Sequence, residues 1–165
     1  MLDLRIEGGT IADGNGGEPF TGDVGVKDGR IVEVSRTASG SAARETIDAN
    51  GAWVMPGFVD IHTHYDGQAT WDDIFSPSIH HGVTAVVMGN CGVGFAPVRP
   101  GREDGLIKLM EGVEDIPGAA LHEGIRWNWE SFPQYMDALE ATPRSLDYLV
   151  PVSYTHLTLP TKRIV

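Results

Sequence analysis

Two histidines separated by one residue follow an apolar stretch of the sequence. The four residues before them have the composition of a buried strand, and His62 and His64 come directly after it. Side chains of a strand alternate between its two faces, so Asp60, His62 and His64 share one face. Val59 and Ile61 take the opposite face, where we expect apolar packing.

Two imidazoles on one strand face deliver two nitrogen ligands to one point, which is what a bound zinc ion requires. Asp66 joins this face if the strand continues that far. The alternative interpretation is two polar residues where a strand exits to solvent. The His-x-His spacing after an apolar strand favours the metal site.

A third candidate ligand follows the next predicted strand, over residues 84–88. Cys91 is the single cysteine of the chain and has glycine at 89 and 92, where a ligand can approach closely. Zinc accepts a thiolate readily, but a lone cysteine is more often a small buried hydrophobe. The residues alone leave both roles open. One cysteine excludes an intrachain disulfide and is typical of a reducing compartment.

A strand–helix–strand pattern connects these positions. Residues 76–82 begin with Ser-Pro and end in glycine, which predicts a helix between the two strands. A unit of this kind implies a parallel sheet, with the chemistry at the carboxyl ends of the strands. The histidine pair and Cys91 both lie at such ends. A third strand is expected from residue 147.

Residues 1–52 form a separate small β module by their pattern. Apolar and charged residues alternate over 2–7, and Asp28-Gly29 between two alternating segments predicts a hairpin. We find no catalytic constellation in this module. Its role is structural in this interpretation.

Residues 97–150 have mainly helical patterns. Four apolar residues recur at the spacing of one helix face and predict a core stripe. These are Leu106, Leu109, Met110 and Val113. Ser131 and Gln134 predict a capping box at the start of a later helix, and Trp127 and Trp129 are interpreted as loop anchors. Three histidines away from strand ends are expected on the surface without a ligand role: His80, His81 and His122.

Composition places the chain among folded proteins. It has 165 residues, of which 41% are hydrophobic, and a formal net charge of −11. The negative charge argues against a nucleic-acid or anionic-membrane partner. No basic segment followed by a long apolar run opens the chain, so we expect no signal peptide, no transmembrane segment and a cytoplasmic location.

Several segments resemble one enzyme family. Residues 54–64 resemble the first barrel strand of the amidohydrolase superfamily, and residues 1–52 resemble the N-terminal part of its β-sandwich. Residues 88–97, 110–117 and 129–133 are similar to the N-acyl-D-amino-acid deacylases, or D-aminoacylases. The resemblance implies an α/β fold: an incomplete (β/α)8 barrel, its first βα units over 53–151, after part of a small β-sandwich. The length falls short of the ~250 residues of a full barrel.

The resemblance also implies a site and a reaction. It assigns Cys91 to a tightly held Zn2+ and His62 and His64 to an adjoining, more weakly occupied metal position, with Asp60 as support behind the ligands. The metal activates water for attack on the amide of an N-acyl-D-amino acid, a small-molecule substrate. The general base and the remaining ligands are expected downstream, so we assign no catalytic base here and expect the chain itself to be inactive. Residues 152–165 depart from the family and are interpreted as a non-native tail, so His156 receives no ligand role.

Two other interpretations remain. The first is another amidohydrolase, such as a hydantoinase or dihydroorotase, which a carboxylated lysine on a later strand would favour and Cys91 disfavours. The second is a non-catalytic, truncated metal-binding fragment. The downstream reading frame would separate them, because a deacylase needs later-strand histidines and a last-strand aspartate. The oligomeric state, the acyl group and the preferred amino acid are not determined by these residues.

Overall fold

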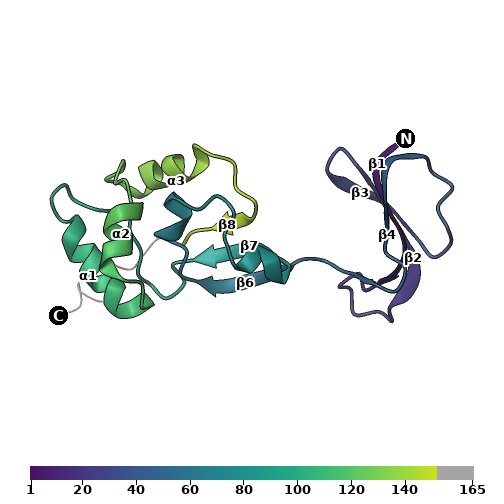
Figure 1. The fold of residues 1–165 in the computed structure, drawn as a ribbon, viewed down its shortest axis with the longest axis horizontal. Coiled ribbons are helices and arrows are strands. Elements are labelled where there is room, and N and C mark those ends of the chain that lie inside the picture. The colour runs from purple at the N-terminus through teal and green to yellow at the C-terminus, as the bar shows by residue number, and fades with distance from the viewer. Residues whose placement is uncertain (152–165) are drawn as a thin grey trace, which may run out of the picture. The chain divides into compact units, whose positions relative to one another are not determined.

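The computed structural model describes residues 1–151 and divides them into two compact units, Met1–Pro56 and a second that begins at Gly57 (Figure 1). The tail over 152–165, with His156, lies outside the described residues. Among the described residues, no helix combines the length and the apolar character needed to cross a bilayer.

The first unit is a mixed β-sheet with strand order β3-β2-β1-β4, and β5 pairs with β1. The predicted hairpin is present: β2 and β3 are antiparallel, and Asp28 and Gly29 between them have φ angles of 51° and 70°. Because β5 pairs with β1, this unit extends to Pro56. The strands are β1 (Leu2–Ile11), β2 (Phe20–Lys27), β3 (Arg30–Ser35), β4 (Ala43–Asp48) and β5 (Trp53–Val54).

The second unit has a parallel three-stranded sheet with order β6-β7-β8. The predicted parallel pairing and the predicted third strand are therefore confirmed. In Figure 1 the arrows of β6 and β7 lie side by side. The elements are β6 (Phe58–Thr63), the 3-10 turns η1 (Gln68–Thr70) and η2 (Ser78–His81), β7 (Val83–Met88), α1 (Glu103–Glu114), α2 (Gly118–Gly124), α3 (Phe132–Glu140) and β8 (Asp147–Leu149).

The core of the second unit lies between β7 and the helices. Val86 and Met88 of β7 have 0% exposed surface, and Met110 of α1, Leu121 of α2 and Leu139 of α3 are equally buried. Burial of this kind stabilises a fold by about 1.5–3 kcal/mol per large apolar side chain. The helices therefore hold β7, with the loop after it, in a fixed position.

The prediction that β6 is a buried strand is wrong for the described residues. Phe58, Val59 and Ile61 are 59%, 58% and 66% exposed. β6 is the edge strand of the sheet, and within residues 1–151 its partner is β7 alone. The apolar sequence of β6 is therefore left without the cover that its composition predicts.

The predicted helix over residues 76–82 is also wrong in type and length. It is the short 3-10 turn η2, and its N-cap is Pro77 with no side-chain hydrogen bond. The Asp72 carboxylate accepts the backbone N–H groups of Ile74 and Ser76, at 2.9 and 3.0 Å, which holds the preceding segment as a turn. Gly82 ends η2 with φ 80°, as the sequence predicts for a C-terminal glycine.

The predicted core stripe of α1 is only partly correct. Met110 is buried and Leu106 packs partly against the core, but Leu109 and Val113 are 43% and 45% exposed. The fully buried partner of Met110 is instead Ile107, one turn before it. α1 lies at the margin of the unit and packs against α2, so only a narrow edge of it is covered.

The start of α3 agrees with the sequence. Ser131 is the N-cap, and the reciprocal bonds of a capping box join it to Gln134. Trp129 anchors its loop through a buried hydrogen bond from Nε1 to the Phe95 carbonyl oxygen, 2.9 Å long. The three histidines expected on the surface are exposed: His80, His81 and His122.

Candidate metal centre

The three predicted ligands come together at the carboxyl ends of β6 and β7. His62 lies within β6, His64 follows the last residue of β6, and Cys91 lies just after β7. One ligand atom from each side chain lies within 4.8 Å of the other two. The parallel pairing of the two strands causes this convergence, because it places both carboxyl ends at the same edge of the sheet.

The donor set fits zinc. The Cys91 Sγ lies 3.9 Å from the His64 Nδ1, and the ring centroids of His62 and His64 are 5.3 Å apart. Ligand atoms around a tetrahedral zinc lie about 3.4–3.6 Å apart, given bonds of about 2.0–2.3 Å. Cys91 and His64 are therefore close to this spacing. The His62 ring is exposed, and its ligand atom lies within 4.8 Å of those of His64 and Cys91. Two imidazoles with a thiolate are donors that zinc prefers.

Two side-chain hydrogen bonds join β6 to β7 and to the loop that carries Cys91. Asn90 donates from Nδ2 to the Ile61 carbonyl oxygen over 2.8 Å. Thr63 donates from Oγ1 to the Val87 carbonyl oxygen over 3.0 Å. Both bonds lie next to ligand residues, so the separation of the histidine pair from Cys91 is fixed by polar contacts as well as by the sheet.

Asp60 contacts the main chain beside a ligand. Its Oδ1 accepts the backbone N–H of His62 over 3.1 Å, and the carboxylate is exposed. This bond holds the backbone at His62 rather than the imidazole ring. Support of the metal centre by Asp60 therefore acts through the strand in this geometry.

Asp66 lies near the centre, but not on the strand face that it would share with the histidines if β6 continued to it. β6 ends at Thr63, and the Asp66 side chain turns inward, where the residue is 1% exposed. A Cβ on Gly89 would lie 3.0 Å from the Asp66 Oδ1, so the backbone before Cys91 passes close to this carboxylate. Gly89 has φ 71°, which also favours glycine. The sequence signal for this contact is the glycine between the strand and Cys91.

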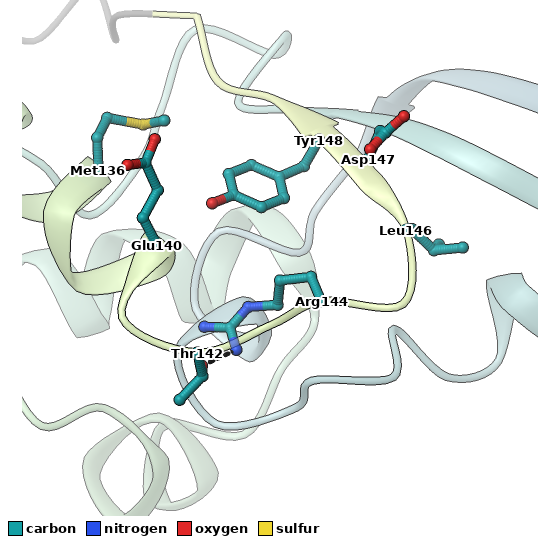
Figure 2. Close-up of a pocket in the computed structure, with 7 residues that line it drawn as sticks. All are labelled: Met136, Glu140, Thr142, Arg144, Leu146, Asp147 and Tyr148. Carbon is teal, nitrogen blue, oxygen red and sulfur yellow. Dashed lines mark hydrogen bonds between the residues drawn. The ribbon is translucent and has the colours of Figure 1, made fainter. Parts of the chain in front are cut away.

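A separate hollow of about 620 Å³ lies at the amino end of β8 (Figure 2). Figure 2 shows Arg144 in this hollow, bonded to Thr142. Arg144 also forms an ion pair with Asp73, which offsets its charge. Burial, and then the nearby Glu140 carboxylate, raise the pKa of Tyr148 here. The metal ligands lie at the opposite, carboxyl ends of the strands, so we do not assign the hollow to the centre.

Comparisons with known proteins agree with this geometry. A model of the Amidohydrolase family matches residues 45–160. The chain belongs to the amidohydrolase family. A D-aminoacylase of Alcaligenes xylosoxydans xylosoxydans is 34% identical over 156 residues, which is 94% of the chain and 30% of that relative. The chain thus spans less than a third of the relative's length.

Two solved structures extend the family assignment to the fold. One, from work on the binuclear metal centre of D-aminoacylase, has a TM-score of 0.74 and 35% identity and covers 93% of this chain and 30% of its own. The other is an N-acyl-D-glutamate deacylase from Bordetella bronchiseptica in complex with zinc and a phosphonate inhibitor. It has a TM-score of 0.66 and 32% identity and covers 92% of this chain and 29% of its own. The predicted resemblance and fold class, the first part of an amidohydrolase barrel after part of a β-sandwich, are confirmed.

Proposed function

We propose that this chain is the N-terminal part of a zinc-dependent hydrolase that deacylates N-acyl-D-amino acids. The observation that carries the proposal is the convergence of three donor atoms, from His62, His64 and Cys91, within 4.8 Å. Identity of 34% to a D-aminoacylase over nearly the whole chain supports the substrate class. In this proposal Cys91 belongs to the tightly held zinc, and the histidine pair belongs to an adjoining, weaker position.

Zinc, when bound, polarises the scissile carbonyl and activates water. The residues of this chain hold the ion and set the geometry around it. The Cys91 thiolate supplies a negative charge, which favours retention of a divalent cation. Asp60 fixes the main chain at His62, and Asn90 fixes the Cys91 loop against β6. We assign no general base within residues 1–151, and we propose that the base lies further along the complete enzyme.

Two competing functions follow from the same cluster. A hydantoinase or dihydroorotase would also present His-x-His after its first barrel strand. The thiol at position 91, where it converges with His64, disfavours that choice. The second competing function is metal binding without catalysis. Only a measurement of turnover in a complete barrel distinguishes this function from deacylase activity.

A chimaera tests the proposed activity. Residues 1–151 of this chain replace the matching first part of the Alcaligenes D-aminoacylase, and amine release from N-acetyl-D-methionine is measured. We expect turnover that is specific for the D form and that a chelator abolishes. The unaltered D-aminoacylase and the N-acetyl-L-methionine substrate serve as controls. A soluble, folded chimaera that binds no metal, or that binds zinc without turnover, would overturn the proposal.

Cys91→Ala in the same chimaera tests the ligand assignment. Removal of the thiolate should strip the tight zinc, because a catalytic site has few protein ligands. Zinc content is measured by mass spectrometry after gel filtration. The matched control is His122→Ala, which removes an exposed imidazole away from the centre. Full zinc content and normal turnover in Cys91→Ala would contradict the assignment.

The 165-residue chain alone should show no deacylase turnover, even with zinc added. General base catalysis typically contributes ~10²–10⁴-fold, and we place the base outside this chain. Metal binding by His62, His64 and Cys91 is compatible with this expectation. The assay compares zinc-loaded and chelated chain on N-acetyl-D-methionine. Chelator-sensitive release of the D-amino acid above background would show that these residues carry more of the machinery.

A further inference from the structure

Two buried aromatic side chains from one short segment hold the main chain beside both ligand-bearing loops. Tyr135 donates its hydroxyl to the Asp66 carbonyl oxygen over 2.7 Å. Trp129 donates from Nε1 to the Phe95 carbonyl oxygen over 2.9 Å. Asp66 lies two residues after His64, and Phe95 lies four residues after Cys91. The two bonds thus reach the histidine loop and the cysteine loop separately.

The two aromatic rings are also joined to each other. Trp129 and Tyr135 pack edge to face with centroids 5.0 Å apart, and both residues are at most 4% exposed. An edge-to-face aromatic pair is stable and directional. The two hydrogen-bonded loops are therefore connected through one aromatic contact. Residues 129–135, which contain this pair, are held in turn by the capping box of α3.

The loop after His64 and the loop after Cys91 also contact each other. A Cβ on Gly67 would lie 3.0 Å from Cε2 of Phe95, so the backbone after His64 packs directly on the Phe95 ring. Phe95 is 1% exposed and contacts Trp127 with centroids 5.8 Å apart. The aromatic bonds therefore act on two loops that are already in contact, and they fix the distance between them.

We propose that Trp129 and Tyr135 are positioning residues of the metal centre, which set the spacing between His64 and Cys91 by holding the main chain after each. They touch neither the ligand atoms nor the substrate in this role. The inference rests on the proposed metal-dependent function. It adds to that function two residues that lie well beyond the ligand strands in the sequence.

A metal-free measurement tests the loop spacing first. Because Cys91 is the only cysteine of the chain, iodoacetamide alkylates this thiol alone, and the rate reports on the opening of the centre around it. Trp129→Phe and Tyr135→Phe each remove one donor and retain an aromatic ring. We expect each variant to raise the alkylation rate about fivefold. This is the increase in the population of locally opened chain that loss of one hydrogen bond produces. Tyr148→Phe is the matched control, because Tyr148 lies in β8 and stacks on Phe75, not on the Trp129–Tyr135 pair.

Metal binding by the same variants tests the role at the centre. Cobalt replaces zinc as a probe, since a thiolate ligand produces a charge-transfer band in the near ultraviolet. We expect both variants to weaken zinc binding about tenfold, the effect of losing support behind metal ligands. The cobalt band should also change in shape in both variants. Tyr148→Phe should retain the affinity and the band of the parent chain.

The outcomes separate the inference from the proposed function. Faster alkylation together with weaker zinc binding supports the positioning role. Unchanged alkylation and affinity in both folded variants overturn it and leave the metal centre intact. A parent chain that binds no zinc and shows no thiolate band overturns the proposed function, and the positioning role with it. If the circular dichroism spectrum shows that Trp129→Phe is unfolded, Tyr135→Phe alone is used to test the positioning role, because it nearly retains the volume of the side chain in the core.

Discussion

The Asn90 side chain donates a 2.8 Å hydrogen bond to the Ile61 carbonyl oxygen, across the gap between the two ligand-bearing strands. Each partner is the immediate neighbour of a ligand residue, His62 on β6 and Cys91 after β7. The amide thus joins the two halves of the centre directly beside a ligand residue on each side. Its position explains why asparagine precedes the cysteine.

Asn90→Ala should weaken zinc binding about tenfold, because the Cys91 loop loses its bond to β6. Competition with a chromophoric chelator measures the affinity. Asn128→Ala, at an exposed asparagine outside the centre, is the control and should bind zinc like the parent. Equal affinities for the two variants would show that the sheet alone sets the ligand spacing.

Ser131→Ala should lower the free energy of unfolding by about 1 kcal/mol, because α3 loses its N-cap. Urea unfolding followed by circular dichroism measures the change. Ser131→Thr keeps the hydroxyl and should recover most of the loss. Ser145→Ala removes an exposed hydroxyl elsewhere and should have little effect. A fully stable Ser131→Ala variant would mean that packing alone holds this helix start.

Asp23 should make the first unit sensitive to acid. Backbone N–H groups of Ser39 and Gly8 bond its carboxylate, at 2.6 and 3.0 Å, and lower its pKa. The folded state therefore binds the proton less readily than the unfolded chain, whose aspartate pKa is about 3.9. The stabilisation is fully present above that pH and is lost as the pH falls through the lower pKa of the folded state.

Asp23→Asn tests this pH dependence. We expect the variant to be less stable than the parent at pH 7, and the difference to shrink as the pH falls below about 4. Urea unfolding at several pH values measures it. Asp137→Asn, on the exposed side of α3, is the control. A stability difference that stays constant down to pH 2 would contradict the role of the Asp23 carboxylate.

The chain alone should associate through its uncovered apolar strands. The exposed side chains of Phe58, Val59 and Ile61 lie on the edge strand β6, and such edges favour intermolecular pairing. We expect binding of a hydrophobic dye and concentration-dependent elution in gel filtration. Ile61→Lys should reduce both more than Leu109→Lys, which changes an exposed leucine on α1. Elution as a monomer at every concentration, with no dye binding, would contradict this prediction.

Local signals in the sequence predicted much of this fold. The Asp28-Gly29 turn, the glycine after η2 and the capping box at Ser131 each depend on a few adjacent residues, and each is confirmed. The parallel pairing of β6 and β7 followed from the connection between them. The convergence of His62, His64 and Cys91 followed from that pairing.

Features that depend on distant contacts were not predicted. The composition of β6 indicates a buried strand, but burial depends on what packs over it, and residues 1–151 leave it open. The buried edge of α1 contains Ile107 rather than Leu109 because the position of α2 decides which edge is covered. The bond from Tyr135 to Asp66 spans 69 residues, and no local pattern contains it.

The short separation of His64 and Cys91 in the chain has a consequence for assembly. Their contact closes a loop of 27 residues, and metal bound at the centre would cross-link that loop. A cross-link of this size removes conformational entropy from the unfolded chain worth about 3–4 kcal/mol. Both ligands precede, in the chain, the helices that cover β7. Early binding of a metal would therefore hold the first two barrel strands together before the later strands of the barrel have been added.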